Sequence, residues 1–346
     1  MGQGAIGMSL FFILSGFILA YQYTDRSVLK YTFYVSRFAR IYPIYIVAAL
    51  AALPWLGIEM EFSSLYEFIR QFIRLAFLIV VNIFITQAWF PQFFSYWNDG
   101  GSWSISVEAF CYAVFPFILP RLKEISKKYL IWTVLILYAF AILPGLSIKL
   151  FPTTVPAPVF YAIPIFRFPE FLIGIACYLL ITAGVDFTKY KKYQFWFIAA
   201  FVCYIGVFGS KMLLYIGHNW IALPFFSFMI LTLFNGRSIL NYVLSAPISV
   251  WFGKISYCFY SFQAVLILPL IDNYEKIVMN FSFLSNNIVL TFVVFVFLTV
   301  FSAVGYYFIE KPAREWIRAS CSPEKPILMQ IIRGGSQNSD REVVIH

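Results

Sequence analysis

Apolar blocks long enough to cross a lipid bilayer recur along the whole chain. Ten are present, at residues 5–23, 41–58, 72–90, 104–120, 129–147, 165–183, 195–213, 219–235, 255–272 and 287–309. An α-helix needs about 20 residues to span a hydrocarbon core of about 30 Å. Strands of a membrane β-barrel would instead alternate between apolar and polar residues over about ten positions. The pattern predicts an all-α, polytopic membrane bundle.

Composition excludes a soluble globular protein. Of the 346 residues, 61% are hydrophobic and 12% are charged, whereas soluble domains are about 45–50% apolar and about 25% charged. No single core could hide 41 Phe, 23 Tyr and 9 Trp side chains from water. The bilayer must therefore be the solvent for much of the surface.

The formal net charge is +9. In a membrane protein this excess is typical of cytoplasmic loops, so we expect membrane lipids and not nucleic acid as partners. The five cysteines and two histidines follow no CxxC or Cys/His spacing of a zinc site. We therefore expect the thiols to pack in the bundle and no metal to be bound.

The distribution of Lys and Arg predicts the orientation of the spans. The most basic connections are 26–40, 121–128, 189–192, 237–254 and 311–318. The positive-inside rule places them in the cytoplasm, and it places 148–164, 211–219 and 272–286 outside. From residue 121 onward, six spans alternate without conflict.

Upstream of residue 121 the alternation fails, because three apolar blocks separate two cytoplasmic segments. One of them should be re-entrant or tilted, which is tolerated only where protein or a water-filled cavity satisfies the backbone. We favour 91–110, where Pro91, Asn98, Asp99, Gly100, Gly101 and Glu108 weaken the apolar signal. This leaves about nine to ten transmembrane segments.

The same rule places the N-terminus outside, and an additional upstream helix would restore a cytoplasmic start. Residues 1–318 are expected to form one integral-membrane domain. The polar segment 319–346 is expected to be a disordered cytoplasmic tail.

Charges inside apolar blocks each cost at least about 2.5 to 3.5 kcal/mol, so each should be functional or paired. Glu108 follows a run of polar side chains, and a site carboxylate and a structural anchor are equally compatible with it. Arg167 and Glu170 are three residues apart and share a helix face, which favours a structural ion pair.

Arg37 and Arg40 are also three residues apart, directly before an apolar block. Two guanidinium groups on one face can bind phosphate, but spacing alone favours anchoring to lipid headgroups. His218 is expected to be a loop residue, and His346 is the terminal residue.

Six short blocks, in order, resemble the acyltransferase 3 family of integral-membrane proteins. They are residues 11–18 (FFILSGFI), 37–43 (RFARIYP), 103–108 (WSISVE), 167–174 (RFPEFLIG), 253–260 (GKISYCFY) and 309–314 (IEKPAR). Members of this family O-acylate bacterial polysaccharides, lipopolysaccharide and peptidoglycan. The resemblance covers residues 5–318.

The resemblance implies a bundle of about ten helices in the bacterial inner membrane. It implies acetyl-CoA or another acyl-CoA as the donor and a carbohydrate or lipid-linked glycan as the acceptor. Arg37 and Arg40 would bind the donor, and Glu108 becomes the candidate catalytic residue. Further residues of the family blocks are Trp103, Ser104, Ser106, Arg167, Glu170, Tyr257, Gln263 and Glu310.

Two departures concern the catalytic base. Family members begin with a further helix that carries a histidine regarded as the base, whereas this sequence starts at the second helix of the pattern. Gln263 also stands where many members carry histidine, and an amide cannot act as a base near neutral pH.

Three functions therefore stay open. The first is a membrane O-acyltransferase, with its histidine supplied by an upstream extension. The second is a transporter or flippase, favoured by a broken helix near an intramembrane carboxylate. The third is an inactive relative that binds without turnover.

Overall fold

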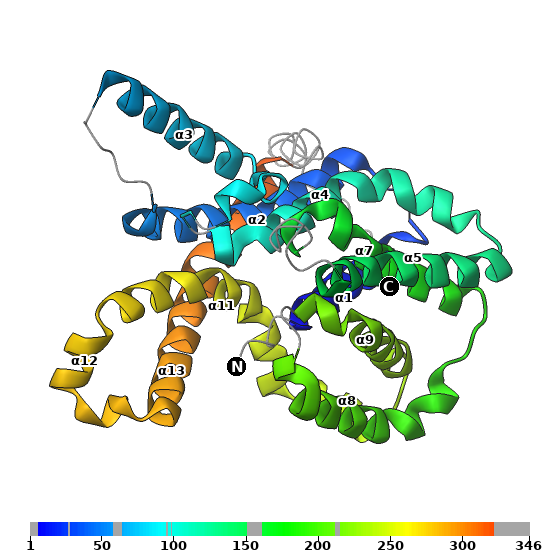
Figure 1. The fold of residues 1–346 in the computed structure, drawn as a ribbon. Coiled ribbons are helices and arrows are strands. Elements are labelled where there is room, and N and C mark those ends of the chain that lie inside the picture. The colour runs from blue at the N-terminus through cyan, green and yellow to red at the C-terminus, as the bar shows by residue number, and fades with distance from the viewer. Residues whose placement is uncertain are drawn as a thin grey trace, which may run out of the picture.

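A computed structural model describes residues 6–26, 28–57, 64–94, 96–97, 99–150, 161–211 and 215–321. The main helices are α1 (Gly7–Tyr23), α2 (Lys30–Ala51), α3 (Leu65–Ile83), α4 (Asp99–Lys123), α5 (Lys127–Leu150), α7 (Pro164–Thr182), α8 (Gln194–Phe208), α9 (Asn219–Leu233), α10 (Ile239–Leu244), α11 (Pro247–Asp272), α12 (Tyr274–Asn280), α13 (Asn287–Gly305) and α14 (Lys311–Ser320) (Figure 1). The described part of the chain contains no β-strand. The all-α prediction is confirmed.

Each of the ten predicted apolar blocks overlaps one of these helices. Within the described ranges, five helical segments are long and apolar enough to cross a membrane: Ser102–Lys123, Lys127–Ser147, Pro164–Thr182, Pro247–Asp272 and Asn287–Ser320. Two more apolar helices, Gly7–Tyr23 and Asn219–Leu233, are shorter. The chain is a multi-pass membrane protein, and the count of nine to ten spans stays a prediction.

The start of α2 differs from the prediction. Residues 26–40 were expected to form a connection, but α2 begins at Lys30, so Arg37 and Arg40 both lie on a helix. The reason is that Phe33 lies on the same helix face as Ile41 and Ile44. All three are buried in the bundle, and this burial extends the helix back into the basic segment.

The segment 91–110, favoured as re-entrant or tilted, is irregular in its first half and helical in its second, and its path through the membrane stays a prediction. Helix α4 runs without a break from Asp99 to Lys123. The irregular backbone lies before it, in the 3₁₀ turns Gln87–Trp89 and Pro91–Phe93, with positive φ angles at Ile85 (55°) and Trp97 (53°).

Serine hydroxyls of α4 hold this irregular segment. The Gln87 amide donates to Ser102 Oγ at 3.2 Å, and the backbone N–H of Ala88 donates to Ser106 Oγ at 3.4 Å. These two hydroxyls therefore satisfy polar groups of a neighbouring non-helical segment and do not interrupt α4.

Helix α3 extends away from the other helices (Figure 1). Only Leu78, Val81 and Asn82 of this helix are buried, and Glu67 pairs with Arg70 at 2.7 Å near its start. It is absent from the five span-like segments of the described chain.

The core forms around α1, whose most extensive contact is with α7. A Cβ atom on Gly16 would lie 2.0 Å from the Phe171 carbonyl oxygen, and one on Gly174 would lie 1.9 Å from the Ile13 carbonyl oxygen. Only glycine at both positions allows the two backbones to approach so closely. Helices α4, α5 and α9 also pack on this pair.

Helix α2 joins this core to a second cluster. Its residues Ile44 and Ala48 pack with Ile255, Cys258 and Phe262 of α11, and α11 packs on α13. The expected tail at 319–346 lies outside the described residues except for the last residues of α14 and Cys321. Most of the 148–164 connection also lies outside them.

Substitution of Gly174 by alanine should force α1 and α7 apart. Overpacking of this kind costs about 1–3 kcal/mol, and more where backbone atoms collide. We expect a clearly lower midpoint of thermal unfolding in detergent, followed by tryptophan fluorescence. Gly206→Ala on α8 is the matched control, because its Cβ would meet open space. Equal midpoints for both variants would rule out the close crossing.

Candidate functional site

One pocket brings together residues from four separate helices. It has a volume of about 130 Å³ and opens between α1, α2, α4 and α11. Its lining consists of Met8, Phe11, Arg40, Ser104, Ile105, Glu108, Ser256, Tyr257 and Tyr260. Of the residues predicted from sequence, Arg40, Ser104, Glu108 and Tyr257 therefore meet in one cavity.

Helix α4 supplies the carboxylate side of the pocket. Ser104, Glu108 and Tyr112 follow each other at intervals of four residues and share one face of the helix. The Glu108 side chain is buried, with 3% of the residue exposed, and it accepts a hydrogen bond from the Tyr112 hydroxyl. The packed ring of Tyr112 thereby fixes the carboxylate.

Helix α11 supplies two tyrosines to the opposite side. Tyr257 and Tyr260 are three residues apart, and the Tyr257 hydroxyl donates to the Ile41 carbonyl of α2 at 2.8 Å. Ser104 Oγ donates to the Tyr260 hydroxyl oxygen at 2.5 Å. In this arrangement the Tyr260 proton is available to a ligand in the pocket.

Arg40 is the cation of the pocket. It lies within electrostatic range of Glu108 and Glu310, but in the described part of the chain no carboxylate oxygen is within 4.0 Å of its guanidinium group. Arg40 is exposed and lines the pocket. Its positive charge can therefore be compensated by a bound anion or by an oxyanion that develops in a reaction.

Arg37 lies one turn before Arg40 on α2. Its guanidinium carbon is 5.8 Å from the centre of the Phe33 ring and 5.5 Å from that of Tyr112. Its Nε atom is buried and has no hydrogen-bond partner among the described residues. The aromatic rings position the side chain without neutralising its charge.

Glu310 lies at a change in helix geometry. Residues Tyr306–Glu310 form a π-helical turn between α13 and α14. Pro312 explains this turn, because it has no N–H to donate and its ring would collide with the carbonyl four residues earlier. The Cys258 thiol donates to Glu310 Oε2 at 3.1 Å, and Arg314 Nη1 lies 3.6 Å from Glu310 Oε1.

The remaining predicted residues do not line the pocket. Trp103 is buried and packs on Phe12 and Tyr161, with ring centres 6.3 Å and 4.7 Å away. Ser106 holds the irregular segment before α4, as described above. Gln263 is half-buried on α11 and lies outside the described lining.

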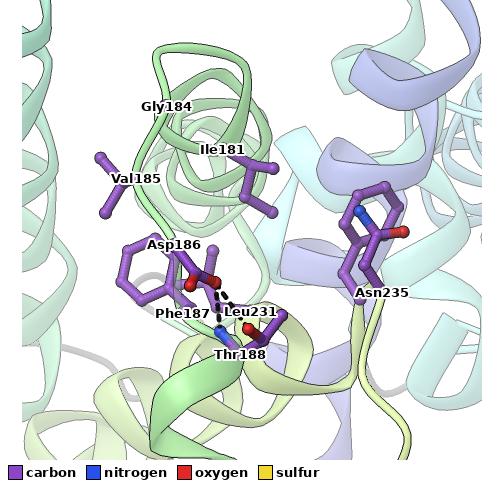
Figure 2. Close-up of a pocket in the computed structure, with 9 residues that line it drawn as sticks. Ile181, Gly184, Val185, Asp186, Phe187, Thr188, Leu231 and Asn235 are labelled. Carbon is purple, nitrogen blue, oxygen red and sulfur yellow. Dashed lines mark hydrogen bonds between the residues drawn. The ribbon is translucent and has the colours of Figure 1, made fainter.

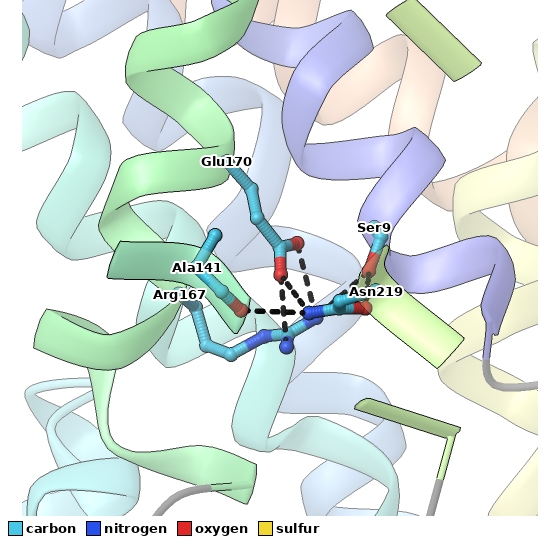
Figure 3. Close-up of polar contacts among 5 residues, drawn as sticks. All are labelled: Ser9, Ala141, Arg167, Glu170 and Asn219. Atoms are coloured by element: carbon cyan, nitrogen blue, oxygen red, sulfur yellow. Dashed lines mark hydrogen bonds and ion pairs between the residues drawn. The ribbon is translucent and has the colours of Figure 1, made fainter. Parts of the chain in front are cut away.

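Arg167 and Glu170 form the ion pair that their spacing predicts. The pair is fully buried, with Arg167 Nη1 at 2.9 Å from Glu170 Oε1 and Nη2 at 3.0 Å from Oε2. Figure 3 shows that Ser9 and Asn219 complete the network. Arg167 donates to Ser9 Oγ at 3.1 Å, and the Asn219 amide donates to Glu170 Oε1 at 3.1 Å. The network joins α1, α7 and α9.

A second pocket, of about 240 Å³, lies at the ends of α7 and α9 (Figure 2). None of the predicted site residues lines it. Asp186 accepts hydrogen bonds there from the backbone N–H and the hydroxyl of Thr188, at 2.8 Å and 2.7 Å. These bonds lower the pKa of the Asp186 carboxyl and form a local turn.

His218 lies in the connection between α8 and α9, as expected from sequence, at the end of the 3₁₀ turn Tyr215–His218. Its side chain is fully buried, with its Nδ1 atom 3.1 Å from the Tyr204 hydroxyl. Burial lowers the pKa of the imidazole below its usual value, so the ring is neutral at pH 7. It does not line either pocket. His346 lies outside the described residues.

Sequence reasoning missed Tyr260, Ser256, Met8 and Phe11 as lining residues. The spacing between Tyr257 and Tyr260 could have placed both on one face of α11. No local signal could have placed Met8 and Phe11 beside Glu108, because that contact depends on how α1 packs on α4.

Comparison with known proteins gives a family match and two relatives. The acyltransferase 3 family model, described as an acyltransferase domain, matches residues 2–308. The acyltransferase MdmB of Streptomyces mycarofaciens is 31% identical over 193 residues, which cover 53% of this chain and 48% of the relative. An uncharacterized protein of Haemophilus influenzae is 26% identical over 194 residues, which cover 53% of this chain and 78% of that protein.

The match therefore spans about half the length of MdmB. No solved structure matches the chain.

A double-mutant cycle tests the structural role of Arg167 and Glu170. Arg167→Met alone leaves a buried carboxylate without its cation, which costs about 3–5 kcal/mol. Glu170→Met should cost a similar amount, whereas the double variant should lose much less than the sum. Thermal unfolding in detergent measures all three. Additive losses would show that the two charges do not stabilise each other.

Proposed function

Because the chain belongs to the acyltransferase 3 family, we propose that it transfers an acyl group, specifically acetyl, from acyl-CoA to a hydroxyl of an envelope polysaccharide or a lipid-linked sugar. The observation that carries the proposal is the pocket that gathers Arg40, Ser104, Glu108 and Tyr257. These residues come from three separate family blocks, which one catalytic centre would explain.

Acyl transfer to a hydroxyl needs a group that accepts its proton. Among the residues that line the described pocket, Glu108 alone can do so at neutral pH. In the proposed reaction the acceptor oxygen attacks the thioester carbonyl while Glu108 accepts its proton. The carbon–sulfur bond then breaks, and the CoA thiolate leaves and takes up the proton that Glu108 accepted. A histidine base, which the family resemblance implies, would take over this role if it reached the same pocket.

Negative charge develops on the carbonyl oxygen during the attack. Arg40 and the Tyr260 hydroxyl face the pocket from different helices, so both can stabilise that oxyanion. Glu108 would then orient and deprotonate the acceptor. The tight hydrogen bond from Tyr112 keeps the carboxylate in place.

The donor is proposed to enter from the cytoplasm. The connections richest in Lys and Arg follow α4 and α7 and lie at the start of α2, and the positive-inside rule assigns them to that side. The proposed location is the bacterial inner membrane, with the C-terminus in the cytoplasm. Arg40 lines the pocket, and Arg37 lies one turn nearer the basic start of α2.

The transporter hypothesis rests on the re-entrant candidate near Glu108, because broken helices and intramembrane carboxylates mark transport sites, and an intact α4 supports it less. Helix α4 passes Glu108 without interruption. An inactive binding subunit differs from the enzyme only in turnover, so an activity assay separates the two.

Glu108→Gln keeps an acceptor for the Tyr112 hydroxyl but removes the base. We expect the rate of acyl transfer in reconstituted membranes to fall about 10²- to 10⁴-fold, with affinity for acyl-CoA retained. Glu67→Gln on α3 is the control, because that carboxylate lies far from the pocket lining. Transfer by Glu108→Gln at the wild-type rate would exclude Glu108 as the base. Donor binding without transfer by the wild type would favour the inactive relative.

The combined substitution Arg37→Ala and Arg40→Ala should abolish donor binding, because it removes both guanidinium groups of α2. Titration of the purified protein with acetyl-CoA measures the affinity. Retention of the wild-type affinity would contradict the assignment of these two arginines to the donor.

A further inference from the structure

Helix α14 brings two more arginines to the pair on α2. It packs directly along α2. Arg318 lies within electrostatic range of Arg314, Arg37 and Arg40. The structure places α14 beside the proposed donor site.

The four arginines, Arg37, Arg40, Arg314 and Arg318, form a row that leads away from the pocket. Glu310 lies within electrostatic range of Arg40, and Arg314 and Arg318 follow it by four and eight residues. At about 1.5 Å per residue, they lie roughly 6 and 12 Å further along the helix. Arg37 precedes Arg40 by one turn on α2, toward the same basic end of the bundle.

The neighbours of Arg318 show where the outer end of this row lies. Arg318 lies within electrostatic range of Tyr23, the last residue of α1 before the basic connection. Arg40, by contrast, lines the pocket with Glu108. The row therefore leads from the pocket to the side from which the donor is proposed to enter.

Four guanidinium groups this close repel one another unless an anion joins them. In the described part of the chain, one carboxylate is within 4.0 Å of any of the four, namely Glu310, which lies 3.6 Å from Arg314. Arg314 keeps 26% of its side chain exposed, and Arg318 is exposed. Such a cluster is suited to a ligand with several phosphate groups, which guanidinium binds in bidentate geometry.

The length of a CoA thioester fits a binding site in two parts, with the thioester in the pocket and the phosphates at the outer arginines. Standard bond lengths put its sulfur roughly 15 Å from its pyrophosphate when the linking arm is extended. If the thioester reacts beside Glu108, the phosphates cannot occupy the same pocket of about 130 Å³. They must lie outside it, where the outer arginines are.

We propose that Arg314 and Arg318 of α14, together with Arg37, bind the phosphate groups of the CoA donor, while Arg40 acts at the thioester end. This inference rests on the proposed function. It assigns a binding role to α14, the end of the span-like segment Asn287–Ser320. Anionic lipid headgroups carry the same phosphate chemistry and are the competing ligand.

The test compares full-length wild type, Arg314→Ala/Arg318→Ala, and the control Lys127→Ala/Lys128→Ala in nanodiscs of neutral phosphatidylcholine. The control removes the same number of charges from the start of α5, on the same expected side of the membrane. Calorimetric titration measures the affinity for CoA. Turnover is then followed with acetyl-CoA and with acetyl-pantetheine, which has the thioester but no phosphate.

We expect the α14 variant to bind CoA at least about tenfold more weakly than wild type, because it loses charged hydrogen bonds. Its KM for acetyl-CoA should rise with kcat unchanged. Its turnover of acetyl-pantetheine should equal that of wild type, and the control should bind CoA normally. Arg318→Ala alone, at an exposed position, should show a smaller effect in the same direction if the double variant does not fold.

Wild-type affinity for CoA in the α14 variants would overturn the inference and leave the proposed function standing, provided that wild type still transfers acetyl groups. Loss of bound phosphatidylglycerol without loss of CoA affinity, in nanodiscs that contain this lipid, would assign the arginines to headgroups. If wild type itself fails to bind CoA, the proposed function fails and this inference fails with it.

Discussion

The crossing of α1 and α7 fixes the rest of the bundle. Gly16 and Gly174 let the two backbones touch, and the Arg167–Glu170 pair joins α7 to Ser9 of α1 and Asn219 of α9. A buried ion pair contributes little net stability over apolar packing, but its geometry is demanding. Its main effect here is on position. It fixes the position of α1, and α1 in turn places Met8 and Phe11 in the lining of the pocket.

Helix α2 then brings positive charge to this core. It is inserted between the α1 cluster and the α11–α13 pair, and the Tyr257 hydroxyl bonds to its Ile41 carbonyl. Arg40 is thereby held near Glu108 and Glu310, which lie on two other elements of the fold. A cation that lines a pocket beside two carboxylates, among aromatic side chains, can stabilise charge that develops in a reaction better than one in water.

Local patterns in the sequence predict the helices and the Arg167–Glu170 pair, because both depend on spacing along one element. They do not predict where α2 begins, since basic side chains surround Phe33, which shares a helix face with Ile41 and Ile44. They also do not predict the contacts of Ser102 and Ser106, whose hydroxyls bond to the segment before α4. The meeting of Arg40, Glu108 and Tyr260 depends on packing between helices distant in sequence, so family blocks could suggest the residues but not their shared cavity.

A structure of the protein with a non-hydrolysable acetyl-CoA analogue, determined by electron cryo-microscopy in nanodiscs, tests this account most directly. The account predicts the thioester analogue between Arg40, Glu108 and Tyr260, with the phosphates along α2 and α14. Density for the analogue at another place, such as the pocket formed by Asp186 and Asn235 at the ends of α7 and α9, would contradict it.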